Sequence, residues 1–160
     1  MKIQSFPSIS NVNAKILILG TMPGAQSLAL SEYYGNPRNH FWQLLFTICN
    51  EPYTTDYEVK KNLLLKNNIA LWDVLQTCER IGSLDSVILK EIPNDFKGFL
   101  NAHPNITHIF FNGQQAAKFF KKHVTINSSY TLVTLPSTSP ANAGIPFEGK
   151  LAAWRQIANF

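Results

Sequence analysis

The order of apolar runs and helical segments predicts an α/β fold, a three-layer α/β/α sandwich with a central, mainly parallel four-stranded sheet. Short apolar runs of the length of buried strands recur along the chain. Segments with helical spacing of apolar residues separate them, as in βαβ units, whose crossovers are right-handed. Glycine or proline follows three of the runs, which marks the end of each strand.

Each element has its own local signal. Runs of branched and aromatic residues predict strands at 15–19, 69–72, 108–111 and 130–135. Apolar residues at helical spacing predict helices at 40–49, 57–67, 94–102, 114–123 and 147–159. The residues in position to cap the first three helices are Asn39, Asp56 or Thr55, and Asn94. Residues 21–37 and 136–144 are punctuated by glycine and proline, and we expect irregular loops there.

The placement of the loops predicts where a ligand binds. In open parallel sheets, ligands bind outside the carboxyl ends of the strands. Residues 20–39, 112–113 and 136–142 each follow a predicted strand. We therefore expect all three segments to line one crevice.

Length and composition are those of one globular domain, expected to span residues 1–160, with 45% hydrophobic residues. The net charge of +4 suits a phosphate-rich partner, although many basic proteins never bind nucleic acid. We find no signal-peptide pattern and no apolar stretch that could cross a bilayer, so we expect a cytoplasmic protein without membrane contact. Cys49 and Cys78 fit no metal spacing and are expected to be reduced thiols.

Several common kinds of active site are not indicated. The sequence has no nucleophile elbow and no zinc deaminase signature. The four histidines have no metal-like spacing. Asp73 and Asp85 are single carboxylates rather than an evident glycosidase pair. We therefore expect neither a metal nor a cofactor.

Three segments carry the groups that suit a nucleic-acid base and its phosphates. The first is Gly20–Gly24, whose glycines would let the backbone come close to a ligand. A plain tight turn would show the same glycines. The second is Tyr33–Trp42, which contains aromatic rings, amides and Arg38. Within it, we expect Trp42 to be a core residue rather than a ligand-binding one. The third is Leu135–Asn142, in which hydroxyl side chains lie between two prolines. This composition fits a phosphate-binding loop and an ordinary connecting loop about equally well.

Together these segments resemble the uracil-DNA glycosylase superfamily, and most closely its hypoxanthine-DNA (deoxyinosine) glycosylase family. The typical motifs of that family, which this chain resembles, are Y-Y-G-N/H-P-x-N-x-F-W, L-W-D-V followed by G-S-L-D-S, and L-P-S-T-S-P-A. The matching positions here are Tyr33–Trp42, Leu71–Val74, Gly82–Ser86 and Leu135–Ala141. The resemblance runs from Lys15 to about Trp154. It implies a monomeric, monofunctional glycosylase of base excision repair that acts on double-stranded DNA with the damaged base flipped out.

The resemblance also implies roles for individual residues. It makes Asn39 the catalytic residue, which positions water or hydrogen-bonds the leaving base. Phe41 is expected to stack on the base, and Gly20, Thr21, Met22 and Asn112 to bind its edge. Contacts to DNA are expected from Arg38, Ser137, Thr138, Ser139 and Asn142.

Position 22 separates the branches of the superfamily. Mismatch-specific uracil glycosylases carry a catalytic Asn where this chain has Met22. A thioether can neither orient water nor receive a proton as an amide or carboxylate does. Hypoxanthine-type members resemble this chain in lacking that Asn, so Met22 favours hypoxanthine over uracil.

Three alternatives remain open on the sequence. One is a G/U mismatch-specific uracil-DNA glycosylase. Another is a catalytically silent DNA-binding or nucleotide-binding module, which would bind duplex DNA in a salt-dependent way and release no base. The third is an unrelated doubly wound domain with a small ligand in the same crevice, which the combination of motifs disfavours.

Overall fold

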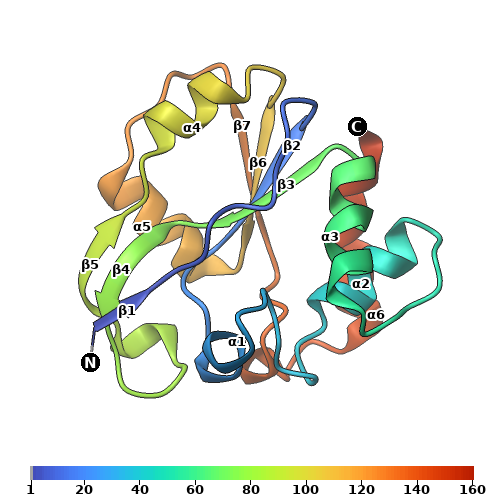
Figure 1. Cartoon of the computed structure of the whole chain (residues 1–160), viewed down its shortest axis with the longest axis horizontal. Helices are drawn as coiled ribbons and strands as arrows, with labels where there is room; N and C mark the ends of the chain where they lie inside the picture. The colour runs from blue at the N-terminus through green and yellow to red at the C-terminus, as the bar shows by residue number, and fades with distance from the viewer. Residues whose placement is uncertain (1) are drawn as a thin grey trace.

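The computed structural model, which describes residues 2–160, contains a central sheet of four parallel strands. Its order is β3-β2-β6-β7, and every neighbouring pair is parallel (Figure 1). The strands are β2 (Ile16–Gly20), β3 (Ile69–Asp73), β6 (His108–Asn112) and β7 (Thr131–Leu135). The parallel four-stranded sheet is as predicted.

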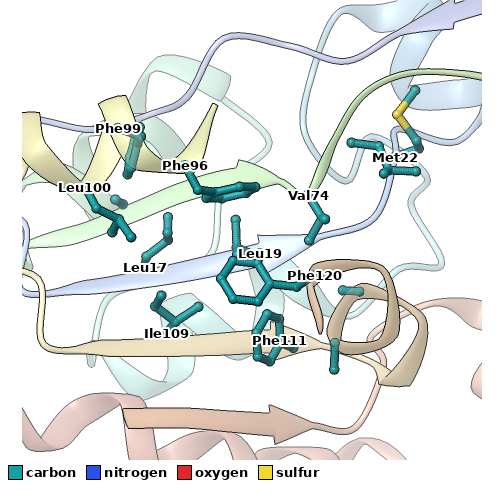
Figure 2. Close-up of a cluster of buried hydrophobic side chains, with 14 of the residues drawn as sticks. Leu17, Leu19, Met22, Val74, Phe96, Phe99, Leu100, Ile109, Phe111 and Phe120 are labelled. Carbon is teal, nitrogen blue, oxygen red and sulfur yellow. The ribbon is translucent and has the colours of Figure 1, made fainter. Parts of the chain in front are cut away.

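Alternating side chains of the buried strands build a separate hydrophobic core on each face of the sheet, because successive residues of a strand point to opposite sides. Leu17 and Leu19 join one core, whereas Ile16 and Ile18 join the other. Figure 2 shows the first core, where phenylalanines and a leucine from the covering helices pack onto the sheet. Helices on both faces make the predicted three-layer sandwich (Figure 1).

The helices divide between these faces. The first core includes residues of α4 (Phe96–Ala102) and α5 (Gln114–His123). The second includes residues of α2 (Phe41–Ile48), α3 (Tyr57–Lys66) and α6 (Phe147–Trp154). A short 3-10 helix, η3 (Arg155–Asn159), follows α6, so the predicted closing helix ends earlier as an α-helix.

A second, antiparallel sheet was not predicted from the sequence. It has the order β1-β4-β5 and consists of β1 (Lys2–Gln4), β4 (Leu75–Glu79) and β5 (Leu89–Pro93). Only Val74 separates β3 from β4, and β5 is mostly exposed, so neither strand gives a clear apolar run. This sheet carries residues 80–88 toward the carboxyl ends of the central strands.

The helix caps are partly as predicted. The Asp56 side chain caps α3 by accepting from the Glu58 N–H at 3.0 Å. Asp95, not Asn94, caps α4 and accepts from the Gly98 N–H at 3.0 Å. Asn94 instead donates through its side chain to the carbonyl of Asp73 at 2.8 Å. That bond ties the start of α4 to the end of β3.

Both predicted loops contain short helices. The first holds α1 (Ala25–Leu30), and the second holds a 3-10 turn, η2 (Pro140–Asn142). The Ser27 hydroxyl accepts from the Gly35 N–H at 2.9 Å, which folds the first loop back on itself. Propensity alone does not specify so short a helix, because tertiary contacts stabilise it.

Two predictions from composition can also be compared with the structure. Cys49 and Cys78 are both free thiols. Within residues 2–160, none of the helices combines the length and apolar character that crossing a membrane requires.

The two-sided core predicts the effect of a truncation. Leu19 is fully buried, whereas Leu89 on β5 is 66% exposed. We expect Leu19→Ala to lower the free energy of unfolding by about 2–5 kcal/mol, because it leaves a cavity against the sheet. Leu89→Ala is the control and should change it by less than about 0.5 kcal/mol. Denaturant unfolding of both variants checks this, and equal losses would contradict it.

Candidate active site

A cleft of about 1140 Å³ lies at the carboxyl ends of the central strands. It is lined by residues from all three segments that were expected to share one crevice. The first contributes Gly20–Ser27 together with Tyr33, Tyr34, Asn36, Arg38 and Asn39, the second Asn112 and Gly113, and the third Pro136–Asn142. The sheet topology thus brings together segments more than 100 residues apart in sequence.

The floor of the cleft forms where β2 and β3 end. Gly20 pairs with Asp73 in the parallel register of these strands. A Cβ atom on Gly20 would lie 2.6 Å from Asp73 Oδ1 and 2.7 Å from the Tyr34 hydroxyl. Only glycine therefore allows both polar groups to approach the backbone here.

Asn39 lies on the cleft wall just before α2, with its amide held in one orientation. Its Oδ1 accepts from the Phe41 N–H at 2.9 Å. Because a backbone N–H must bond to oxygen, the amide cannot be flipped, and its NH₂ group is the part left for a ligand. Asn39 thus binds the first turn of the helix, as a cap-like residue would, and also offers donors to the cleft.

The structure corrects the aromatic residue expected to meet a base. Phe41 is fully buried and does not line the cleft. Tyr34 does line it, and its ring stacks on Phe41 with centroids 4.1 Å apart. Phe41 therefore supports Tyr34 from behind. The sequence places a second aromatic pair, Tyr33 and Tyr34, close to Phe41. The left-handed backbone of Tyr34 (φ 54°) is not evident from the sequence.

Asn112 and Thr138 hold the third segment against the sheet. The Asn112 amide donates to the Thr138 hydroxyl and accepts from the Thr138 N–H, both at 2.9 Å. Thr138 is fully buried, so its side chain does not reach DNA in this conformation, contrary to expectation. Asn112 lines the cleft but uses its amide oxygen and one N–H on this loop.

The rest of the third segment is a stiff loop closed by its own hydroxyls and amides. Ser139 Oγ accepts from the Ala141 N–H at 3.1 Å, and Asn142 donates to the Ser137 carbonyl at 3.1 Å. Ser137, Ser139 and Asn142 are partly exposed and line the cleft. Arg38 is exposed at the cleft.

A fourth segment, residues 83–85, also lines the cleft, although no role was predicted for it from the sequence. Ser83, Leu84 and Asp85 line the cleft beside the first predicted segment, where the Ser83 hydroxyl accepts from the Ala25 N–H at 2.8 Å. Behind them, the buried Arg80 guanidinium donates to the Pro23 carbonyl and lies 3.6 Å from Asp85 Oδ1. The G-S-L-D-S motif in the sequence includes this segment. Its place at the cleft depends on the second sheet, which was not predicted.

Met22 and Thr21 are both buried at the cleft. Met22 belongs to the first hydrophobic core and lies at one end of it (Figure 2). The carbonyls of Gly20 and Thr21 accept from the N–H groups of Val74 and Leu75, at 2.8 and 3.3 Å. These bonds fix the backbone that was expected to meet a base edge.

Burial dominates the electrostatics of the floor. The pKa of Asp73 is raised to about 7, mainly by burial and in addition by the nearby Asp85, while Arg80 acts in the opposite direction. Burial also raises the pKa of Tyr34, with Asp73 as the next cause, so Tyr34 stays a neutral phenol. The cleft floor therefore presents a neutral phenol and a carboxyl that gains or loses its proton near neutral pH.

Residues 2–160 provide no cluster of three or more His, Cys, Asp or Glu side chains suited to a metal ion. Among the same residues, no lysine lines the cleft. The groups available for chemistry are amides, hydroxyls and carboxyls.

The fold and the cleft together define an α/β domain with a polar site outside the carboxyl ends of a parallel sheet, flanked by a proline-bounded loop. The model of the uracil DNA glycosylase superfamily matches residues 7–158. The chain therefore belongs to this superfamily.

Three relatives support the same placement. A Methanosarcina acetivorans protein named hypoxanthine DNA glycosylase is 39% identical over 87% of each chain. A protein of the same name from Methanosarcina barkeri is 36% identical over 89% of each chain. The solution NMR structure of a candidate uracil DNA glycosylase from Methanosarcina acetivorans has a TM-score of 0.80 at 34% identity and covers 98% of this chain and 99% of its own.

The raised pKa of Asp73 predicts a pH-dependent stability. Above its usual pKa of 3.8, the unfolded chain releases a proton that the folded chain keeps up to about pH 7. Asp73 therefore contributes most to the free energy of unfolding of the wild type below pH 3.8, and this contribution is lost as the pH rises through 7. Asp73→Asn removes the effect.

The stability of Asp73→Asn relative to wild type should therefore rise by on the order of 2–4 kcal/mol between pH 4 and pH 8. Denaturant unfolding at pH 4, 6 and 8 measures this difference. A difference that does not change with pH would show that the carboxyl ionises normally in the folded protein.

Proposed function

We propose that this protein is a monofunctional, cytoplasmic DNA glycosylase of base excision repair, active as a monomer. It hydrolyses the N-glycosidic bond of deaminated bases in double-stranded DNA, with hypoxanthine favoured. The observation that carries the proposal is the cleft that both the oriented Asn39 amide and Tyr34 line. The relatives named hypoxanthine DNA glycosylase and the thioether at Met22 support hypoxanthine as the base.

The target base must leave the helical stack to reach such a cleft. The loop of residues 136–142 is stiff, bounded by prolines and anchored to the sheet through Thr138. It is suited to enter the duplex and fill the space that the base leaves. Ser137, Ser139, Asn142 and Arg38 would grip the phosphates around it. A mismatched or damaged pair costs less to open, which contributes selectivity.

Tyr34 would stack on the extruded base, with Phe41 fixing the position of its ring. This replaces the stacking role expected for Phe41, which Tyr34 separates from the cleft. The backbone at Thr21 and Met22, together with the remaining N–H of Asn112, would contact the base edge. Each of these groups lines the cleft.

Asn39 would act through the N–H donors of its amide. An amide is a poor general base, so it orients water or the leaving base rather than removing a proton. Departure of the base leaves an oxocarbenium-like sugar, which the DNA phosphates stabilise electrostatically. Without a lysine among the cleft residues, an imine with the sugar has no nucleophile, so the backbone is not cut and the enzyme is monofunctional.

Base excision tests this function directly. End-labelled duplexes with one hypoxanthine or one uracil are incubated with the protein and then treated with hot alkali to cleave abasic sites. We expect alkali-dependent cleavage at hypoxanthine, and little at uracil. Cleavage mainly at uracil would move the protein to the mismatch uracil branch. Binding of DNA without release of either base would identify a silent binding module.

Two substitutions at Asn39 separate its chemical role from its structural one. Asn39→Asp keeps an oxygen for the Phe41 N–H but loses the amide donors, whereas Asn39→Ala loses both. We expect each to reduce the single-turnover excision rate by at least about 10²-fold, with DNA affinity nearly unchanged. Gel-shift titration and thermal unfolding are the controls. Full activity of Asn39→Asp would remove Asn39 from the mechanism.

A further inference from the structure

The least explained side chain of the cleft is Asp73. It is 3% exposed, it lines the cleft, and its Oδ2 is buried without a hydrogen-bond partner. Its Oδ1 lies close against Gly20. A buried polar atom without a partner costs about 1–3 kcal/mol and is rarely kept for structural reasons alone.

Asp73 is not needed to cap a helix. Its backbone carbonyl accepts from Asn94, a bond that any residue at this position would make. Arg80, the nearest cation among its electrostatic neighbours, is directed to Asp85 and to the carbonyls of Pro23 and Gly82. The carboxyl is therefore left facing the cleft.

The groups around Asp73 favour its protonated form. Asp85 in the short 3-10 helix η1 (Asp85–Val87) favours the protonated form, and Arg80 after β4 opposes it. The neutral phenols of Tyr33 and Tyr34, before α2, also face Asp73. The pKa of Asp73 rises to about 7, mainly through burial. A carboxyl with such a pKa both holds and releases a proton near neutral pH, as a general acid must.

We propose that Asp73 is a second catalytic residue, whose protonated carboxyl donates a proton to the base as the glycosidic bond breaks. This inference rests on the proposed function. The bond between C1′ and N9 breaks, and its electron pair stays with the base. The Asp73 proton moves to an acceptor on the base edge that reaches the floor, N7 or O6 in hypoxanthine.

The products balance as in a hydrolysis. Water adds its oxygen to C1′ and releases one proton, and the Asp73 carboxylate takes up one proton before the next turnover. The base leaves neutral, the sugar carries a hydroxyl, and no oxidant or reductant takes part. Tyr34 cannot replace Asp73 in this step. Burial raises the pKa of its phenol above the ordinary value, so the phenol does not release its proton near neutral pH.

The test is the pH profile of single-turnover excision from a hypoxanthine duplex at saturating protein, from pH 5.5 to 9. The wild-type rate should fall about tenfold per pH unit above pH 7, as Asp73 loses its proton. Asp73→Asn keeps the shape and a hydrogen-bond donor but cannot transfer the proton. It should be slower by about 10²-fold at pH 6.5 and should lack this fall.

The matched control is Asp56→Asn, the same chemical change at the exposed cap of α3, which does not line the cleft. It should keep the wild-type rate and profile. Wild-type activity that is flat to pH 9, an Asp73→Asn rate within threefold of wild type, or a slow variant that keeps the alkaline fall would each overturn the inference. Release of no base by the wild type at any pH would instead overturn the proposed function.

Asp85→Asn provides a second, independent variant. The negative charge of Asp85 raises the pKa of Asp73, so removing it should lower that pKa. The alkaline fall in rate should then begin at a lower pH than in the wild type. An unshifted fall, or a shift to higher pH, would show that another group controls the profile.

Discussion

The pairing of Gly20 with Asp73 in the parallel register of β2 and β3 is the constraint on which the cleft depends. It places a residue without a side chain beside a buried carboxyl, and the space so left admits the Tyr34 hydroxyl. A shift of one residue would turn every side chain of β3 to the opposite face and remove Asp73 from the floor. The hydrophobic cores prevent this shift, because Ala70 and Leu71 are fully buried on opposite faces.

The buried acid on the cleft floor illustrates how a site can oppose the stability of its fold. An Asp that must stay protonated near neutral pH makes the folded state less stable there than an amide would. The surrounding cores offset that cost, since β3 and its neighbour β2 are almost fully buried. Sites that work through unusual protonation are commonly maintained in this way.

The sequence predicted the layers, the parallel sheet and the shared crevice, because apolar runs and glycine-bounded turns report directly on buried strands. It did not predict β4, whose alternating pattern is short and directly follows β3, nor therefore the wall around Ser83 and Asp85. Phe41 was chosen over Tyr34 for stacking because motif and composition do not reveal which of two neighbouring rings is covered. Such choices depend on tertiary packing, as does the reciprocal bonding of Asn112.

The double hydrogen bond between Asn112 and Thr138 has a consequence for sequence variation. It fixes the loop of residues 136–142 at a buried point, while Ala143 and Gly144 beyond it are exposed. Substitutions at these outer positions leave the anchor untouched. Related proteins can therefore diversify the tip of the loop, and with it the DNA context they prefer, without redesigning the scaffold beneath.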